Sequence, residues 1–164
     1  MKIELRPLEQ EDWIAVAAIY RQGIETGNAT FQKEIPTWDE WNSAHLKKCR
    51  IIACIEDEIA GWAALSPVSA RSVYAGVAEV SVYVSNKFIG QKIGSRLLEA
   101  LISESGKEGI WTLQASIFRE NGASLKLHKN LGFREVGYRE KIGKMDGVWR
   151  DTILLERRSR IAGI

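Results

Sequence analysis

The apolar positions between residues 77 and 102 follow two different periods. Residues 77–84 carry four valines among small and polar residues and are followed by Ser-Asn-Lys, a pattern typical of a buried β-strand. From Ile93 to Ile102 the apolar residues recur at the spacing of one face of a helix. The sequence therefore predicts a strand that leads through a turn into an amphipathic helix.

Two glycines, Gly90 and Gly94, lie in this turn. The first backbone N–H groups of a helix have no partner within the helix, and they lie at the positive end of the helix dipole. Such a terminus favours an anion, most often a phosphate, and glycine lets the main chain approach it closely. The alternative is that the glycines only shape a tight turn between strand and helix, because weak glycine-rich matches are common.

The rest of the chain alternates between strand and helix patterns. Strands are predicted at residues 2–6, in a hairpin over residues 50–67, and at residues 110–118, 133–140 and 148–156. Further helices are predicted at residues 9–20, 37–48 and 121–132. Residues 23–36 and 68–76 lack periodicity and are expected to be loops, the first of them facing a substrate. This order predicts an α/β fold with a mixed sheet and no internal repeat.

The composition is that of an ordinary globular protein. With 164 residues, 45% of them hydrophobic and 27% charged, the chain suits one domain spanning residues 1–164. The sequence contains neither a signal-peptide core nor a transmembrane run, so we expect a cytoplasmic protein with no membrane partner. The net charge of +2 argues against a nucleic-acid partner. We interpret Arg157, Arg158 and Arg160 as a solvated tail.

No metal site is expected. His45 and His128 are the only histidines, and they are far apart in the sequence. Cys49 and Cys54 lack the spacing of zinc ligands, so we predict buried or free thiols rather than a disulfide or a metal site.

The glycine turn also carries a more specific resemblance. Residues 89–94 resemble the acetyl-CoA loop of the GNAT acetyltransferases, whose consensus (Q/R)xxGx(G/A) stands at a strand-to-helix junction. Ile89 replaces the leading Gln or Arg, and Lys92 replaces the first glycine. A lysine with left-handed dihedral angles would cost roughly 1–2 kcal/mol, although its ammonium could also contact a phosphate. We interpret the loop as a functional variant.

The order of the predicted elements is also the GNAT order. The resemblance implies a mostly antiparallel sheet of about seven strands, with helices on both faces and a central parallel pair that splays apart. It also implies acetyl-CoA as a co-substrate. Five segments narrow the resemblance to the phosphinothricin and methionine sulfoximine N-acetyltransferases. They are ATF at residues 29–31 followed by PTWDEW, RSVY at 71–74, AEVSVYVS at 78–85, NGASLKLHKNLGF at 121–133 and DGVWRD at 146–151.

Acetyl transfer to an amine needs a base for the ammonium proton, a donor for the oxyanion and a proton for the leaving thiolate. Glu79 is the best candidate base, because partial burial in an apolar strand would make its carboxylate a stronger base. Backbone N–H groups near Val82, Tyr83 and Val84 are candidate oxyanion donors if this strand splays from its neighbour. His128 can supply a proton near neutral pH. The alternatives are a salt-bridged strand glutamate and a packing histidine.

The resemblance also implies roles at the matched positions. Glu79 falls at the general base, His128 near the CoA sulfur, and Asn121 and Ser124 at polar positions that contact the pantetheine arm. The loop contacts would be Ile89, Gly90, Gln91, Lys92, Ile93, Gly94 and Ser95.

On the acceptor side, Phe31 matches an aromatic residue of the acceptor pocket. Arg71 and Tyr74 match a pair that holds acidic groups, for which a guanidinium fork is well suited. Some phosphinothricin enzymes have a second basic residue two positions before this arginine, where this chain has Ser69. The resemblance therefore implies an amino-acid-like acceptor such as phosphinothricin or methionine sulfoximine or sulfone, and it suggests a homodimer.

Other functions stay open at this point. A CoA-binding or nucleotide-sensing module could have lost turnover through Ile89 and Lys92. An enzyme of the same fold could instead acetylate a protein N-terminus, a polyamine or an unrelated small amine. Glu79 favours an enzyme over a sensor, because a half-buried carboxylate is costly for a protein that only binds.

Overall fold

The valine-rich strand and the helix after it lie at the centre of the fold. The computed structural model describes residues 2–164 and shows the strand as β4, Val77–Val84, and the helix as α3, Ile93–Lys107. β4 pairs along its length with β3, Glu58–Pro67, and α3 buries its apolar face, including Leu101, against the sheet. The predicted strand, turn and helix are therefore confirmed.

Within residues 2–164, seven strands form one mixed sheet in the order β1-β2-β3-β4-β5-β7-β6. The remaining strands are β1 Glu4–Pro7, β2 Ile51–Ile55, β5 Thr112–Phe118, β6 Arg134–Met145 and β7 Val148–Arg158. The remaining helices are α1 Trp13–Glu25, α2 Trp38–Ala44 and α4 Gly122–Asn130, with short 3-10 helices at Gln10–Asp12 (η1), Ser72–Tyr74 (η2) and Asn86–Phe88 (η3). β4 and β5 are parallel, and all other neighbours are antiparallel.

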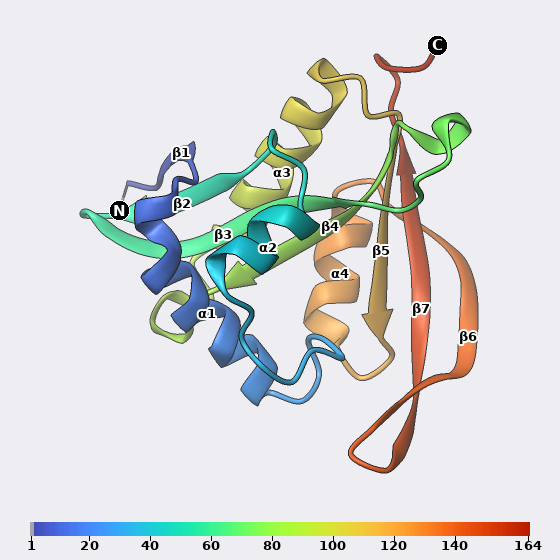
Figure 1. The fold of residues 1–164 in the computed structure, drawn as a ribbon, viewed down its shortest axis with the longest axis horizontal. Coiled ribbons are helices and arrows are strands. Elements are labelled where there is room, and N and C mark those ends of the chain that lie inside the picture. The colour runs from blue at the N-terminus through green and yellow to red at the C-terminus, as the bar shows by residue number, and fades with distance from the viewer. Residues whose placement is uncertain (1) are drawn as a thin grey trace.

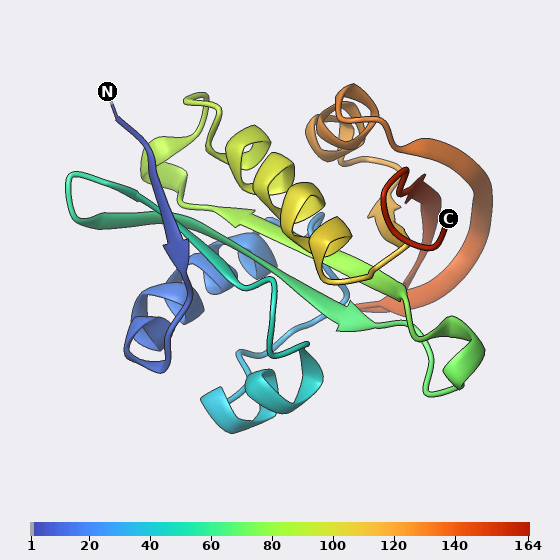
Figure 2. The same ribbon diagram turned by 90° about the horizontal axis from the view of Figure 1, so that it is seen from above.

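Helices cover both faces of the sheet, as predicted. Figure 2 shows α1 and α2 on one side of the sheet and α3 and α4 on the other. The α3 side holds the larger apolar core, built from the inward faces of α3 and of the strands. The α1 side holds an aromatic core with Trp41 and Trp62 as its largest fully buried members.

The parallel strands β4 and β5 lie side by side only where they begin. Their residues pair from Val77 with Thr112 to Glu79 with Gln114, and no later pair joins the two strands in the described chain. Beyond these positions β4 stays with β3, and β5 stays with β7. In Figure 1 the two ribbons start together and then diverge. The predicted splay of the central parallel pair is therefore confirmed.

The helix α1 is longer than its sequence pattern predicts. It continues to Glu25 and includes Gly23, so the loop predicted from residue 23 begins after the helix end. A Cβ atom added at Gly23 would lie 2.6 Å from the ring of Tyr83. The glycine is therefore explained by close packing of the helix on Tyr83 rather than by a chain turn.

The helix α2 ends at Ala44, before the predicted end at residue 48. The guanidinium of Arg50 donates to the backbone carbonyls of Asn42, His45 and Leu46, and so takes the place of further helical hydrogen bonds. The ring of His45 stacks on Trp41 with centroids 4.2 Å apart. These contacts of residues 45–50 compete with helix continuation and end the helix early.

The edge strands also differ slightly from the prediction. β1 is an edge strand as expected, but it includes Pro7, which is tolerated at the end of an edge strand. β6 continues to Met145 because a bulge between Arg139 and Gly143 lets it pair with β7 again. The predicted Asp146-Gly147 turn is confirmed, with φ of 50° and 79° at the two residues.

None of the helices within residues 2–164 combines the length and apolar character that crossing a bilayer requires. Over the same residues, no group of three or more His, Cys, Asp or Glu side chains is placed to hold a metal ion. Cys49 and Cys54 are buried free thiols, as predicted.

Candidate active site

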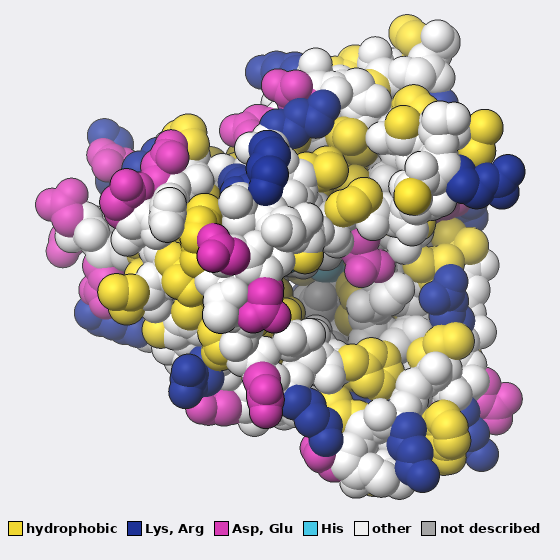
Figure 3. Space-filling view, in the orientation of Figure 1, with side chains coloured by type: hydrophobic (Ala, Val, Ile, Leu, Met, Phe, Trp, Pro, Cys, Tyr) yellow, Lys and Arg dark blue, Asp and Glu magenta, His cyan; other side chains and the backbone are white. Residues whose placement is uncertain are grey.

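A cavity of about 510 Å³ lies where β4 and β5 diverge. Residues 79–84 of β4 form one wall, and residues 115–118 of β5 form another. Residues 29–32 of the loop after α1 and the first turns of α4 complete it. Figure 3 shows the surface hollowed between the helical side of the molecule and the β6–β7 hairpin. Ligands of open α/β sheets usually bind at this position, outside the carboxyl ends of diverging strands.

Glu79 is the last residue of β4 that pairs with β5, and the cavity begins there. Its Oε1 accepts a hydrogen bond from Nε2 of Gln114 at 3.2 Å. Among residues 2–164, Glu79 is the only carboxylate that lines the cavity, and no lysine or arginine lines it. A carboxylate held by a neutral amide rather than by a cation is suited to accept a proton from a bound substrate.

The backbone of β4 beyond Glu79 presents polar groups to the cavity. Pairing with β3 continues to Val84 and satisfies the groups on that side. The alternate groups that face β5 have no partner strand among the described residues, and Val82, Tyr83 and Val84 line the cavity. Unpaired N–H groups on a cavity wall can donate to a developing oxyanion. The splay thus makes these backbone groups candidates for the predicted oxyanion donors.

His128 lies on α4, is buried and lines the cavity. Its Nδ1 lies 2.7 Å from the carbonyl oxygen of Ser124, and this contact assigns the ring hydrogen to Nδ1 because a carbonyl can only accept. Burial lowers the pKa of His128, so the ring is neutral near pH 7. The other nitrogen, Nε2, then acts as an acceptor. A role in proton donation to the thiolate would require His128 first to take up a proton against its burial.

The turn before α3 has the backbone of an anion site. Gly90 and Lys92 have left-handed φ of 83° and 63°. Lys92 is the N-cap of α3, and its side chain makes no capping hydrogen bond, which leaves the N–H groups of residues 93–95 without a side-chain cap. Oε1 of Gln91 is buried, and within residues 2–164 no donor reaches it. The side chain of Ile93 is in the core, so only its backbone is available to a ligand.

Comparison with known proteins identifies the family. The sequence model of the Acetyltransferase (GNAT) family matches residues 5–133. This chain belongs to the GNAT acetyltransferase family. The protein YwnH of Bacillus subtilis strain 168 is 36% identical over 159 residues, which cover 93% of this chain and 97% of that protein. The phosphinothricin N-acetyltransferase of Alcaligenes faecalis is 32% identical over 161 residues, which cover 93% of this chain and 81% of that protein.

A solved structure gives the same GNAT fold. It is a phosphinothricin acetyltransferase of the GNAT superfamily from Sinorhizobium meliloti, in complex with acetyl-CoA. The TM-score is 0.89 at 26% sequence identity, and the match covers 99% of this chain and 91% of that chain. The predicted GNAT fold is therefore confirmed.

The turn before α3 fits acetyl-CoA, the co-substrate of GNAT enzymes. A Cβ atom added at Gly90 would meet no atom within 4 Å, so the main chain there is open to a ligand. The uncapped helix terminus and the left-handed backbone are favourable for a pyrophosphate. Gly94 itself lines the cavity, so this turn adjoins the space that contains Glu79. The residues present thus fit an anion at the turn and a thioester in the cavity.

Replacing Lys92 with glycine should stabilise the ligand-free protein. Lys92 is exposed and has a left-handed φ of 63°, a conformation that costs a non-glycine residue about 1–2 kcal/mol. We expect the melting temperature to rise by about 2–4 °C for each kcal/mol gained, measured by calorimetry without ligand.

The matched control for Lys92→Gly is Asp57→Gly in the β2–β3 turn, where φ is 68° and the residue does not line the cavity that contains Glu79. Both variants should gain stability. Only Lys92→Gly should lose affinity for acetyl-CoA if the ammonium contacts a phosphate. An unchanged melting temperature for Lys92→Gly would show that the left-handed lysine is not strained.

The cavity brings together about half of the residues proposed from the sequence. Those that line it are Phe31, Glu79, Val82, Tyr83, Val84, Gly94, Asn121, Ser124 and His128. Those outside its lining are Ile89, Gly90, Gln91, Lys92, Ile93, Ser95, Arg71 and Tyr74. The first six of these lie on the turn before α3 or in the first turn of that helix.

Arg71 and Tyr74 form a separate surface group. Arg71 precedes the short helix η2, and its guanidinium lies 5.7 Å from the ring centre of Tyr74. Both residues are exposed, Tyr74 by 47%, and the neighbouring Val73 is exposed as well. Within one copy of the chain, the structure does not bring this expected acceptor clamp to the cavity.

Several residues of the cavity wall were not predicted from the sequence. Phe118 stacks edge-to-face on Phe31 with ring centres 4.7 Å apart, and it ends β5 at the cavity. Its place at the carboxyl end of a predicted parallel strand was a usable signal. Thr152 lies opposite Phe118 in the β5–β7 register. Nothing in the sequence reveals that β7 is inserted between β5 and β6, so Thr152 could not be found.

Tyr83 has a further feature besides its place in the cavity lining. Its ring stacks on Trp62 with centres 4.9 Å apart. Burial raises the pKa of Tyr83, and the nearby Tyr20 raises it further. The Tyr83 hydroxyl therefore keeps its proton at neutral pH and can donate a hydrogen bond. The sequence suggested only a backbone role for this residue.

Proposed function

We propose that this protein transfers the acetyl group of acetyl-CoA to the amino group of a small amino-acid-like acceptor. The observation that carries the proposal is Glu79 at the point where β4 and β5 separate, inside a cavity bounded by the turn before α3. The family supports the same reaction class, since its name describes acetyl transfer. Relatives named for phosphinothricin support the acceptor class.

Each side chain has a defined part in this proposal. Acetyl-CoA, when bound, supplies the acetyl thioester. Glu79 accepts one proton of the acceptor ammonium through a water molecule, and the free N–H groups of β4 near Val82 donate to the thioester oxygen. The amine nitrogen then bonds to the thioester carbon, the C–S bond breaks, and the second proton of the amine passes to the leaving thiolate. Asn121 and Ser124 line the cavity at the start of α4, where they can bind the pantetheine arm. Phe31 supplies an apolar wall for the acceptor.

A thiol-release assay with acetyl-CoA tests this function. The acceptor panel should include phosphinothricin, methionine sulfoximine, methionine sulfone, standard amino acids, polyamines and an N-terminal peptide. We expect turnover with the amino-acid analogues, and we expect saturating acetyl-CoA at about one hundred times its Kd to stabilise the protein by roughly 2.7 kcal/mol. Stabilisation without turnover of any acceptor would instead indicate a CoA-binding sensor, and no stabilisation would reject the co-substrate.

The acceptor clamp needs a second copy of the chain. The cavity of one copy has no basic side chain among its lining residues in the described chain, and Arg71 lies outside it. The connection that carries Arg71 also has exposed apolar residues, among them Val68 and Val73. We therefore include in the proposal a homodimer in which Arg71 of each copy reaches the cavity of the other.

Arg71→Ala should raise the acceptor KM by more than about tenfold, because a hydrogen bond to a charged group contributes about 1.5–3 kcal/mol. The KM for acetyl-CoA should not change. Arg71→Lys should recover only part of the loss, because an ammonium lacks the bidentate fork. Steady-state kinetics with each substrate varied in turn measure these values.

Mixing two variants tests whether the clamp comes from the other copy. If Arg71→Ala and Glu79→Gln chains are unfolded and refolded together, a symmetric dimer should recover about a quarter of the wild-type sites. Mixing folded chains without exchange is the control. Absence of recovery, or an Arg71→Ala variant that loses affinity for acetyl-CoA instead, would show that Arg71 does not hold the acceptor across a dimer.

A further inference from the structure

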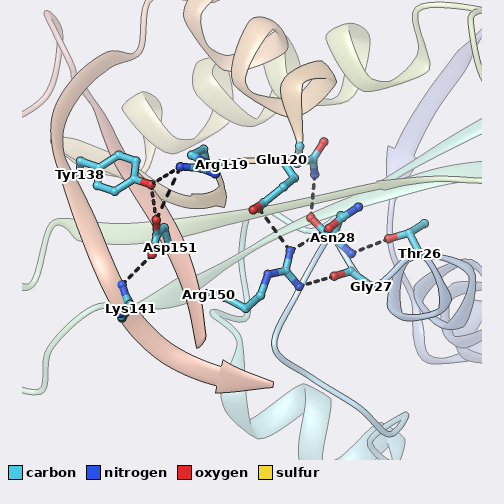
Figure 4. A network of polar contacts seen from close by, with 10 residues as sticks. Thr26, Gly27, Asn28, Arg119, Glu120, Tyr138, Lys141, Arg150 and Asp151 are labelled. Atoms are coloured by element: carbon cyan, nitrogen blue, oxygen red, sulfur yellow. Dashed lines mark hydrogen bonds and ion pairs between the residues drawn. The ribbon is translucent and has the colours of Figure 1, made fainter. Parts of the chain in front are cut away.

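Arg150 on β7 makes the most extensive polar contacts near the cavity, although it does not line it. Only 13% of its side-chain surface is exposed. One guanidinium nitrogen donates to the carbonyl oxygen of Gly27 at 2.8 Å, and the other donates to Oδ1 of Asn28 at 2.8 Å. The second nitrogen also lies 3.3 Å from a carboxylate oxygen of Glu120. Figure 4 shows Arg150 between the loop after α1 and the end of β5.

The loop that Arg150 holds leads directly to the acceptor wall. Ala29, Thr30, Phe31 and Gln32 line the cavity immediately after Asn28. Asn121 also holds this loop, because its Nδ2 donates to the carbonyl oxygen of Asn28 at 3.2 Å. The loop is therefore fixed from β7 and from the start of α4 just before its cavity-lining residues begin.

Arg150 also supports the second aromatic ring of this wall. Its guanidinium carbon lies 4.1 Å from the centre of the Phe118 ring, which is close enough for a cation–π contact. Phe31 packs edge-to-face on Phe118, and a Cβ atom at Gly143 would lie 2.6 Å from the Phe31 ring. The position of Phe31 therefore depends on Phe118 and on the loop that carries it.

We propose that Arg150 is a positioning residue that sets the acceptor side of the cavity by holding Gly27, Asn28 and Phe118 in one arrangement. The inference rests on the proposed function, since it concerns how the same site selects its acceptor. Arg150 acts through the loop and the ring, without touching the acceptor. A planar guanidinium can donate to two hydrogen-bond acceptors and stack on an aromatic ring at the same time, which a lysine ammonium cannot do.

A neighbouring arginine offers a matched control. Arg119 follows Phe118 directly, and it donates to the hydroxyl of Tyr138 and lies 3.9 Å from Asp151. Its side chain is largely exposed, and within residues 2–164 its hydrogen bond and its ion pair go to Tyr138 and Asp151, neither of which lines the cavity. Removal of Arg119 therefore changes the charge near the site without releasing the loop.

The test compares Arg150→Met, Arg150→Lys, Asn28→Ala and Arg119→Met by steady-state kinetics and amide hydrogen exchange. Arg150→Met should lower kcat/KM for the acceptor by about ten- to hundredfold, mainly through KM, because misplaced substrate contacts are costly. The KM for acetyl-CoA should stay unchanged. Amide exchange in residues 26–32 should become at least about tenfold faster without ligands. Arg150→Lys should show a partial recovery.

Asn28→Ala keeps the test valid if Arg150→Met does not fold. Asn28 is exposed, so its truncation should leave the fold intact, and it should shift acceptor KM and loop exchange in the same direction by a smaller amount. Arg119→Met should match the wild type in both measurements. Unchanged acceptor KM and unchanged loop exchange in Asn28→Ala and the folded Arg150 variants would overturn the positioning role. Full activity of Arg150→Lys would overturn the requirement for the fork.

The exchange measurement separates this inference from the proposed function. If the unaltered protein acetylates no amine, the proposed function fails. Amide exchange in residues 26–32 that becomes faster in the Arg150 variants would still show that Arg150 holds this loop. If the unaltered protein is active and the Arg150 variants keep its acceptor KM, the positioning inference alone is wrong.

Discussion

Glu79→Gln should slow acetyl transfer by about 10²–10⁴-fold at neutral pH and leave acetyl-CoA binding unchanged, because general-base catalysis contributes a factor of this size. The substitution preserves the shape of the side chain. Gln114 can turn its amide to donate or accept, so the contact that now joins its Nε2 to Oε1 of Glu79 can be kept. The variant should therefore fold normally, and the loss should appear in kcat.

The pH profile makes this prediction specific for a base. As pH rises, the acceptor amine loses its proton without help, so the difference between Glu79→Gln and the wild type should shrink. Glu99→Gln, an exposed glutamate on α3, is the control and should match the wild type throughout. Equal turnover of Glu79→Gln and the wild type at pH 7, with acetyl-CoA saturating, would show that Glu79 has only a structural role.

Local sequence patterns were enough to predict most of the fold. The valines of β4 and the apolar face of α3 follow the periods of a strand and a helix, and the structure places them there. Errors occurred where tertiary contacts override local preference. Gly23 suggested a helix end, but it lies inside α1 because the Tyr83 ring leaves no room for a Cβ atom. Arg50 ends α2 early through contacts that no local pattern encodes.

The site was predictable where it follows from one strand and one turn. Glu79 and the β4 backbone lie together because they belong to one strand, and the anion turn follows directly in the chain. The acceptor wall combines segments far apart in the sequence, such as Phe31, Phe118 and Gly143. Their proximity depends on the insertion of β7 beside β5 and on the bulge in β6. Neither feature has a signature in the sequence.

The wall also depends on the aromatic core beneath it. Trp62 on β3 is 1% exposed and lies opposite Tyr83 in the β3–β4 register. Its ring contacts Trp41 and Tyr20, each with centres 5.6 Å apart, and stacks on Tyr83. Within residues 2–164 its buried Nε1 has no hydrogen-bond partner, so its contribution comes from packing. The cavity wall at Tyr83 is thus supported by the core of the α1 face.

Trp62→Ala should lower the free energy of unfolding by about 3–5 kcal/mol, because truncating a buried tryptophan removes its contacts and leaves a cavity. Urea unfolding followed by circular dichroism measures the change. Trp149→Ala is the matched control, because Trp149 is 54% exposed on β7 and should cost much less. The stability of Trp62→Phe should lie between those of the two alanine variants, since it keeps an aromatic ring and removes the unpaired N–H group.

In the folded fraction of Trp62→Ala, Tyr83 loses its stacking partner, so the acceptor KM should rise. If Trp62→Ala were as stable as Trp149→Ala, the aromatic core would not support this wall, and the position of Tyr83 would have to be fixed by α1 and the sheet alone.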